Sequence, residues 1–444
     1  MNQENSETRN ALLDLLHEPR NYLAIVLFVL TVIVFVVMRR DSSANDATVR
    51  PVAARRATQP DLPPPPPPSA PGSRGMKPVQ RPEHVRALYL NAWAAGSTRK
   101  LQKLIDIANQ TEVNSFVIDV KEGGEVSYTT EVKLAQRASA VRNYVPNVRA
   151  VLTRLKENDI YPIARIVVFK DPVLALALPE FAVKNADGTI WQDNKGKAWV
   201  DSYNKQVWDY NIALAREAVE LGFAEVQWDY VRFPDAPRSY LERGVWPAQN
   251  GRTKPDGIRE FLLYAREKLA DLKVPLTADV FGLTVSTKGD MGIGQQWEKM
   301  IDAVDVILPM VYPSHFIRGN YGLSNPNAAP YRTIKRSMED AVARSRAVPN
   351  AALIRPWLQA FTLGAPRYGP AHVRAQIEAV YDAGLKEWVL WSPGSNYDAA
   401  ALAPHDGDAP KFEIPGGRGE PRVRTDTVKK DTLLGSPVRG PAGR

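Results

Sequence analysis

The chain has 444 residues, of which 44% are apolar, and its 57 Lys and Arg against 49 Asp and Glu give a formal net charge of +8. This length accommodates two or three average domains or one large barrel with a sizeable core. The absence of cysteine excludes disulfides, thiolate zinc sites, iron–sulfur clusters and cysteine nucleophiles, and the five histidines show no HxH or HExxH spacing, so we expect neither a metal nor a cofactor.

After a polar N-terminal segment, residues 1–21, the stretch 22–38 reads YLAIVLFVLTVIVFVVM and carries no charge. At 1.5 Å per residue a helix over it would be roughly 25 Å long, which is enough to span a thin bilayer. A buried core helix is the alternative, but the run has no polar face. Because no small-residue cleavage site follows closely, we predict an uncleaved, single-pass membrane anchor.

Residues 39–82 form a basic linker rich in proline, with six consecutive prolines at 63–68. Such a run adopts an extended polyproline helix, so the linker is expected to act as a stalk. Its arginines fit a solvated segment near anionic headgroups better than a nucleic-acid site. By the positive-inside rule these arginines would keep the following domain in the cytoplasm, although large domains are translocated regardless of flanking charge. A polysaccharide substrate outside the cell would favour the opposite orientation, with the domain outside the cytoplasm.

The domain at 83–404 contains eight short apolar runs rich in β-branched and aromatic residues, nearly continuous in hydrophobicity, as strands buried on both faces are. They are VRALYLNAW (85–93), SFVIDVK (115–121), YPIARIVVF (161–169), AEVQWDYV (224–231), PLTADVFG (275–282), DVILPMVYP (305–313), LIRPWLQAF (353–361) and EWVLWSP (387–393). The tail at 405–444 is rich in Gly, Pro and mixed charges, and we expect it to be disordered or loosely draped.

Amphipathic stretches separate these runs, and glycine closes several of them, as at Gly222 and Gly384. The clearest are 98–110, 147–159, 206–222, 257–272 and 373–385. Eight β-then-α units predict an α/β protein with a (β/α)8 TIM barrel. A doubly wound open sheet is the alternative, but no GxGxxG or GxxxxGK[ST] follows any strand. An active site is expected at the C-terminal ends of the strands.

Alternation of side chains along a strand predicts which residues share a face. In the fourth run Gln227, Asp229 and Val231 fall on one side, and Trp228 and Tyr230 on the other. The same rule groups Asp119 with Lys121, Arg165 with Val167 and Phe169, and Thr277 with Asp279. If these faces point into the barrel mouth, Asp229 and Asp279 flank one cavity.

Two carboxyl groups at one cavity suit the cleavage of a glycosidic bond, in which one attacks or stabilises the sugar and the other protonates the leaving oxygen. We therefore take Asp229 and Asp279 as candidate catalytic residues. Buried Asp–Arg and Asp–Lys pairs that only tie barrel layers together are the competing interpretation. The number of polar and aromatic residues at strand ends favours a site, and the candidate substrate-binding residues are Asp119, Lys121, Arg165, Arg232, Tyr312, Gln359 and Trp391.

Aromatic residues are frequent at or just past the predicted strand ends and in the long loop after the third strand. They are Trp93, Tyr128, Trp191, Trp199, Tyr203, Phe281, Tyr312, Trp357, Trp391 and Tyr397. Flat rings near carboxylates stack on the apolar faces of sugars, so this set favours a carbohydrate ligand.

At these residues the chain resembles the bacterial "putative glycosyl hydrolase domain" family of TIM barrels, which are membrane-anchored or secreted and are related to the α-amylase and α-galactosidase-like glycosidases. The matching pieces are FVIDVKEGGEVSY, IARIVVFKDP, WVDSYN, VQWDYVRFP, TADVFG, ILPMVYPSH, RPWLQAF and WVLWSPGSNY, in this order. The resemblance implies an aspartate nucleophile on the fourth strand, which is Asp229. A proton donor on the fifth strand would be Asp279, and Asp235 or Glu122 are alternatives.

The leading hypothesis is a glycoside hydrolase of the retaining kind, held at the bacterial inner membrane by residues 22–38, with its barrel outside the cytoplasm. Its partners would be a cell-wall or extracellular polysaccharide and the membrane, and no nucleic acid. A non-catalytic carbohydrate-binding barrel is the main alternative. A metal-dependent hydrolase or deacetylase on the same fold is a third, which the scarcity of histidine disfavours.

Overall fold

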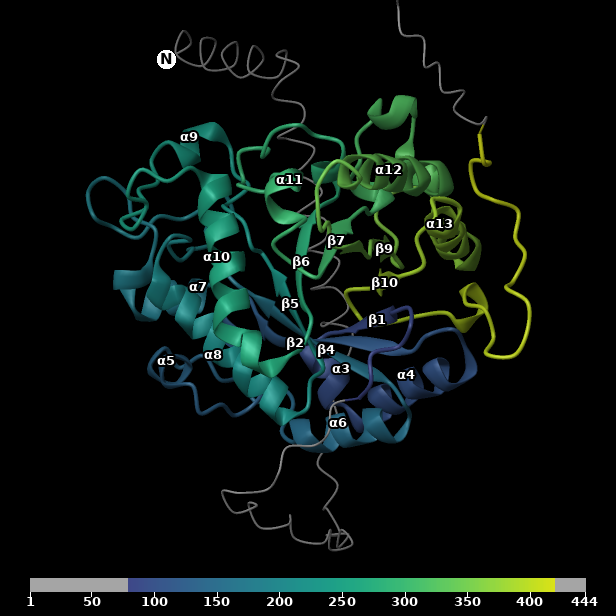
Figure 1. Cartoon of the computed structure of the whole chain (residues 1–444), viewed down its shortest axis with the longest axis horizontal. Coiled ribbons are helices and arrows are strands. Elements are labelled where there is room, and N and C mark those ends of the chain that lie inside the picture. The colour runs from purple at the N-terminus through teal and green to yellow at the C-terminus, as the bar shows by residue number, and fades with distance from the viewer. Residues whose placement is uncertain (1–78, 420–444) are drawn as a thin grey trace, which may run out of the picture. The chain divides into compact units, whose positions relative to one another are not determined.

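In the computed structural model, which describes residues 79–419, eight parallel strand positions form a closed barrel with helices around it (Figure 1). The barrel closes because β1 pairs with both β2 and β10. The seventh position holds two short strands, β8 and β9, which Arg355 and Pro356 separate. The strands are β1 (Arg86–Leu90), β2 (Ser115–Glu122), β4 (Tyr161–Val167), β5 (Glu225–Asp229), β6 (Leu276–Phe281), β7 (Val306–Met310), β8 (Leu353–Ile354), β9 (Trp357–Gln359) and β10 (Trp388–Trp391), and β3 (Glu125–Val126) pairs antiparallel with β2.

Helices follow most of these strands and cover the outside of the barrel. The long ones are α4 (Thr98–Gln110), α6 (Val148–Glu157), α8 (Lys205–Leu221), α10 (Lys254–Leu269), α12 (Pro330–Ser345) and α13 (Pro370–Asp382). The short ones are α3 (Ala92–Gly96), α5 (Lys133–Arg137), α7 (Pro172–Ala177), α9 (Arg238–Leu241) and α11 (Trp297–Met300).

The predicted (β/α)8 barrel is confirmed, and each of the eight apolar runs contains a barrel strand. The five predicted helices are present with ends shifted by a few residues. Gly222 caps α8 with a φ of 124°, a conformation that costs other residues a steric clash of Cβ. The open-sheet alternative is wrong, because β1 and β10 are hydrogen-bonded rather than free edges.

The core has two parts, as expected for strands buried on both faces. Between strands and helices, residues such as Leu88, Phe116 and Trp228 face outward and pack against the helices. Inside the barrel, Ala87, Val117, Ile163, Leu308 and Val389 fill the axis. At both ends of the barrel the inward-facing positions are occupied by polar residues. The polar residues at one end have a different role from those at the other.

At the N-terminal end of the barrel, Arg355 is fully buried between two glutamates. Its guanidinium contacts Glu225 at 2.6 Å and Glu387 at 2.9 Å, and Glu387 also accepts from Arg81 at 2.6 Å. Two positive and two negative groups thus neutralise one another away from the strand ends where function is expected. We assign this network to stability.

Several predicted segments lie outside the described residues. These are the N-terminal segment at 1–21, the membrane span at 22–38, residues 39–78 of the predicted linker, and the tail from residue 420. Within residues 79–419 no helix has the length and apolar character needed to cross a bilayer. Residues 405–419 run beside α12 and α13, where Arg418 pairs with Glu378 at 2.7 Å and Asp382 at 2.5 Å.

Replacing Arg355 by Met should destabilise the chain, because it leaves Glu225 buried without a counter-charge, at a cost of roughly 3–5 kcal/mol. The matched control is Arg238→Met, which breaks an exposed pair with Glu242 and should cost at most about 1 kcal/mol. Urea unfolding followed by tryptophan fluorescence measures both. Equal losses in the two variants would contradict the assignment.

Candidate active site

A single arginine, Arg165 of β4, gathers three carboxylates at the C-terminal end of the barrel. Its Nη1 donates to Asp119 Oδ1 at 2.5 Å and to Glu122 Oε2 at 2.6 Å. Its Nε and Nη2 both donate to Asp229 Oδ2, at 3.0 and 2.5 Å. The fork of one guanidinium therefore fixes the relative positions of β2, β4 and β5 at this rim.

Asp119 is the most enclosed acid of this group. Besides Arg165 it accepts a hydrogen bond of 2.6 Å from the Tyr89 hydroxyl. Burial raises its pKa to about 6, while the Arg165 charge opposes the rise and the Glu122 charge adds to it. With three carboxylates around one cation, a proton is retained here at higher pH than on an isolated aspartate.

Asp229 is the last residue of β5 and lies on the wall of a cavity at the rim. The next residue, Tyr230, has a φ of 48°, an uncommon left-handed conformation for a residue with a side chain. Its backbone N–H donates to Asp229 Oδ1 at 2.5 Å. Arg165 on one oxygen and this N–H on the other thus orient the carboxylate.

The turn at Tyr230 also corrects the predicted alternation. Trp228 faces outward and packs on Phe261 of α10 as expected, but Tyr230 lines the same cavity as Asp229. Val231, expected beside Asp229, lies instead in the outer core. A left-handed residue ends the two-residue period, so alternation holds only up to Asp229.

Asp279 of β6 lies deeper than the sequence predicts. It is 0% exposed and does not line the cavity. Gln227 Nε2 donates to its two oxygens at 2.8 and 3.0 Å, and the indole N–H of Trp357 donates to Oδ1 at 2.7 Å. Burial first, and the neighbouring Asp229 charge second, raise its pKa well above the usual value. Asp279 therefore supports the cavity wall from behind.

The cavity has a volume of about 480 Å³, within the range of small-molecule sites. On one side Tyr312 stacks on Trp391 with centroids 5.0 Å apart, and Phe361 packs edge-on against both rings. The other lining side chains are Arg165, Lys195, Asp229, Tyr230, Arg232, Asp235, Phe281, Leu283, Met310, His315, Phe316 and Trp357. Aromatic rings and the Asp229 carboxylate thus line the same cavity.

Five of the predicted site residues line this cavity, namely Arg165, Asp229, Arg232, Tyr312 and Trp391, and Asp119 lies behind Arg165. Of the ten aromatic residues expected near sugar, Phe281, Tyr312, Trp357 and Trp391 line it. Tyr128, Trp191, Trp199 and Tyr203 belong to the outer core instead. Trp93 is exposed beside Tyr144, and Tyr397 lies outside the cavity lining, where its hydroxyl donates to the Tyr89 carbonyl at 2.7 Å.

Lys121 and Gln359 lie away from the cavity. A β-bulge between Asp119 and Lys121 shifts the register of β2, so Lys121 points outward, pairs with Asp171 at 2.8 Å and lies over Tyr210. Gln359 is buried, and its side chain joins β9 to the loop after β7 through Ser314 N at 3.0 Å. Both residues hold strand ends in place.

Side-chain periodicity did not predict Lys195 and His315, two polar residues of the cavity lining. Lys195 belongs to the long loop after β4, and His315 to the short 3-10 turn Pro313–His315 after β7. Neither lies on a strand, so side-chain periodicity carries no information about it. Only the path of each loop over the rim brings them to the cavity. Across residues 79–419 no cluster of three acidic or histidine side chains is arranged to hold a metal ion.

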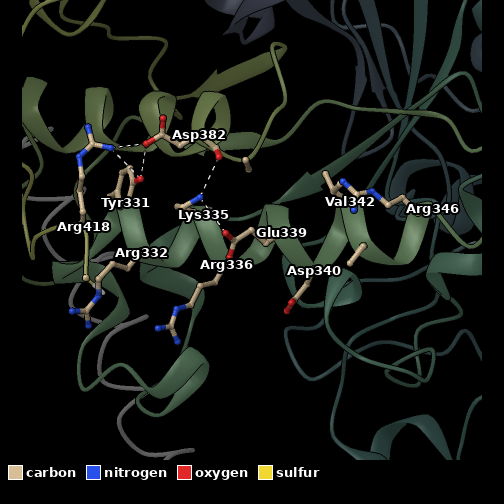
Figure 2. A pocket seen from close by; sticks show the side chains of 13 residues that line it. Tyr331, Arg332, Lys335, Arg336, Glu339, Asp340, Val342, Arg346, Asp382 and Arg418 are labelled. Carbon is tan, nitrogen blue, oxygen red and sulfur yellow. Dashed lines mark hydrogen bonds and ion pairs between the residues drawn. The ribbon is translucent and has the colours of Figure 1, made fainter. Parts of the chain in front are cut away.

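A larger hollow, of about 630 Å³, lies on the outer surface along α12 (Figure 2). Its charges are largely satisfied within the chain: Arg418 pairs with Asp382, and Lys335 with Glu339 at 3.1 Å. It contains none of the strand-end residues. We therefore place the candidate active site at the barrel rim.

Comparisons with known proteins concern the barrel as a whole. A family model described as "Putative glycosyl hydrolase domain" matches residues 87–397. The glycoside hydrolase domain of PgaB (BpsB) from Bordetella bronchiseptica superposes with a TM-score of 0.52 at 13% identity, covering 72% of this chain and 99% of that one. This likeness shows the barrel fold alone.

A hypothetical protein from Ruminiclostridium thermocellum ATCC 27405 is 42% identical over 44% of this chain and 97% of its own, with a TM-score of 0.40. The glycoside hydrolase domain of PelA from Pseudomonas aeruginosa, as its E218A variant, is 12% identical with a TM-score of 0.40, covering 71% and 97% of the two chains. Among curated proteins, none matches this chain.

The position of Asp119 predicts a pH effect on stability. Since its pKa is about 6 in the folded chain against 3.8 ordinarily, the native state binds more protons between these values, and its stability falls as pH rises from about 4 to about 6. The loss should be on the order of 2–3 kcal/mol. Urea unfolding across this range measures it.

The control is Asp119→Asn, which cannot titrate and should flatten this part of the profile, whatever its effect on absolute stability. An unchanged slope in that variant would assign the effect to other groups.

Proposed function

Because the chain belongs to the family described as "Putative glycosyl hydrolase domain", we propose that its barrel cleaves glycosidic bonds of a cell-wall or extracellular polysaccharide. The observation that carries this proposal is Asp229, a carboxylate that Arg165 holds in a cavity also lined by the stacked rings of Tyr312 and Trp391. The apolar faces of a pyranose pack on such rings while its anomeric carbon faces the carboxylate.

In the proposed reaction Asp229 attacks the anomeric carbon and forms a glycosyl ester as the bond to the leaving oxygen breaks. Arg165 and the Tyr230 N–H hold the attacking carboxylate in one orientation, which lowers the entropy cost of reaching the transition state. Water then attacks the same anomeric carbon, breaks its bond to Asp229 and releases the sugar, while the carboxylate that had protonated the leaving oxygen takes up the water's proton. The overall result is hydrolysis with retention.

The leaving oxygen needs a proton, and two acids are candidates for the donor. Asp235 lies in the loop after β5, is exposed and lines the cavity. Asp279 has a pKa raised by burial but is enclosed by Gln227 and Trp357. We propose Asp235 as the donor because a substrate oxygen can reach it. Asp279 then has a structural role, in which its hydrogen bond from the Trp357 indole holds that ring in the cavity wall.

The anchor at 22–38 and the stalk that follows it belong to this proposal as sequence-based expectations. They would tether the barrel to the bacterial inner membrane, on the side where cell-wall and extracellular polysaccharides are found. Protease accessibility in intact cells tests the sidedness.

Asp229→Asn should lower kcat/KM for hydrolysis by roughly 10³-fold or more, because the amide is a poor nucleophile. The measurement is release of reducing ends from an array of α- and β-linked polysaccharides by the full-length chain, in a detergent without a sugar headgroup. Unchanged tryptophan fluorescence and unfolding midpoint serve as the folding control.

Azide should restore turnover of the Asp229→Asn variant and yield a glycosyl azide. An active variant without azide would remove Asp229 from the nucleophile's role. Saturable binding of an oligosaccharide by the wild-type chain with no turnover of any substrate would favour the non-catalytic binding barrel instead.

The two donor candidates are separated by matched amide variants. Asp235→Asn should lower kcat/KM on polysaccharide by on the order of 10²–10⁴-fold, and spare a dinitrophenyl glycoside whose leaving group needs no proton. Asp279→Asn should stay within roughly tenfold of wild type, because the neutral amide resembles the protonated acid. The reverse pattern would make Asp279 the donor.

A further inference from the structure

Arg232 differs from the other buried arginines of the barrel. In residues 79–419 four arginines are buried: Arg165, Arg232, Arg355 and Arg374. Arg165, Arg355 and Arg374 each contact a carboxylate within 2.9 Å. Arg232, only 7% exposed, has no described carboxylate within the 4.0 Å of an ion pair and donates a single hydrogen bond, to the Phe233 carbonyl at 2.9 Å.

Aromatic rings hold this guanidinium in place. Its central carbon lies 4.5 Å from the centroid of Phe281, 4.7 Å from that of Tyr230 and 5.3 Å from that of Trp199. Cation–π contacts offset part of the desolvation of a buried cation, but an ion pair with hydrogen bonds offsets far more. The rings thus orient the guanidinium without an ion pair to neutralise it. Burial lowers the pKa of Arg232, and the nearby Tyr230, Asp229 and Asp235 oppose this shift.

The unmatched charge faces the candidate active site. Arg232, Phe281 and Tyr230 line the same cavity as Asp229. Asp229 is already engaged by Arg165, so it is not free to neutralise a second arginine. Lys195 adds a further positive group to the lining, and Asp235 adds an acidic one. Arg232 therefore presents a buried positive group without an ion-pair partner to a sugar that lies against Asp229.

We propose that the sugar bound beside Asp229 carries a carboxylate and that Arg232 binds it, so that the substrate is an acidic polysaccharide of the uronic acid type. This inference rests on the proposed glycoside hydrolase function. A planar carboxylate accepts two parallel N–H donors from a guanidinium, which a neutral hydroxymethyl group cannot do. A neutral sugar would leave a buried cation unpaired, and such sites reject the uncharged analogue.

The test measures binding separately from turnover. Uronic acid oligosaccharides of several linkages are each compared with their carboxyl-reduced, neutral counterparts and with sulfated neutral counterparts, by calorimetric titration of the full-length Asp229→Asn variant. The expected result is at least tenfold tighter binding of a carboxylated member than of its reduced and sulfated partners. No preference, tighter binding of the sulfated member, or no binding of any carboxylated member would overturn the proposal.

Substitution of Arg232 identifies the group responsible. Added to Asp229→Asn, Arg232→Gln should abolish the preference for the carboxylated member, and Arg232→Lys, which keeps the charge but not the fork, should retain part of it. Arg243→Gln, whose guanidinium lies over Tyr240 outside the cavity lining, is the control and should retain all of it. If the Arg232 variants fail to fold, the comparison of carboxylated and reduced sugars in the Asp229→Asn variant decides alone.

Parallel hydrolysis assays with the wild-type chain keep the two proposals apart. Turnover of neutral and carboxylated polysaccharides at equal kcat/KM would remove the role of Arg232 and leave the hydrolase intact. Selective binding of the carboxylated member without turnover would keep the role of Arg232 and remove the hydrolase.

Discussion

The pairing of one guanidinium with three carboxylates is the constraint on which the rim of this barrel depends. Arg165 could not remain buried without counter-charges, and Asp119, Glu122 and Asp229 could not lie so close together without a cation between them. The pairing joins β2, β4 and β5, and it leaves Asp229 with a fixed orientation at the cavity. An active site that needs a positioned carboxylate thus gains it from an interaction that also joins three strands of the barrel.

The two ends of the barrel use buried arginines differently. At the N-terminal end, Arg355 lies between Glu225 and Glu387, and Arg81 completes the charge balance. At the C-terminal end, Arg165 has an excess of carboxylates and Arg232 has none within ion-pair distance. Stability requires that buried charges are neutralised within the chain, whereas recognition and catalysis require charged groups that a bound substrate neutralises. The imbalance is therefore concentrated where the family's glycosyl hydrolase chemistry is expected.

The fold could be predicted from sequence because its strands are buried on both faces. Runs such as 161–169 and 305–313 are almost wholly apolar, a pattern that few structures other than parallel strands accommodate. The inward direction of Arg165 and Asp229 followed from alternation, because β4 and β5 are regular up to those residues. The site was harder to predict where regularity ends.

Three local features account for the differences. The bulge in β2 turns Lys121 outward, the left-handed Tyr230 brings a ring into the cavity, and the side chains of Gln227 and Trp357 enclose Asp279. None has a marker in sequence, since neither Val120 nor Tyr230 is a glycine. Lys195 and His315 reach the cavity through loop paths that periodicity does not describe. The faces of regular strands were predictable, and the backbone irregularities that complete the site were not.

Chemical rescue of an arginine deletion tests the central role of Arg165 most directly. In Arg165→Ala the carboxylates lose their common cation, and added guanidinium ion, at concentrations too low to unfold the chain, can occupy the vacated space. The account predicts that hydrolysis is lost in the variant and returns in a saturable manner with guanidinium but not with sodium. Full hydrolysis by a folded Arg165→Ala chain without any added ion would contradict it.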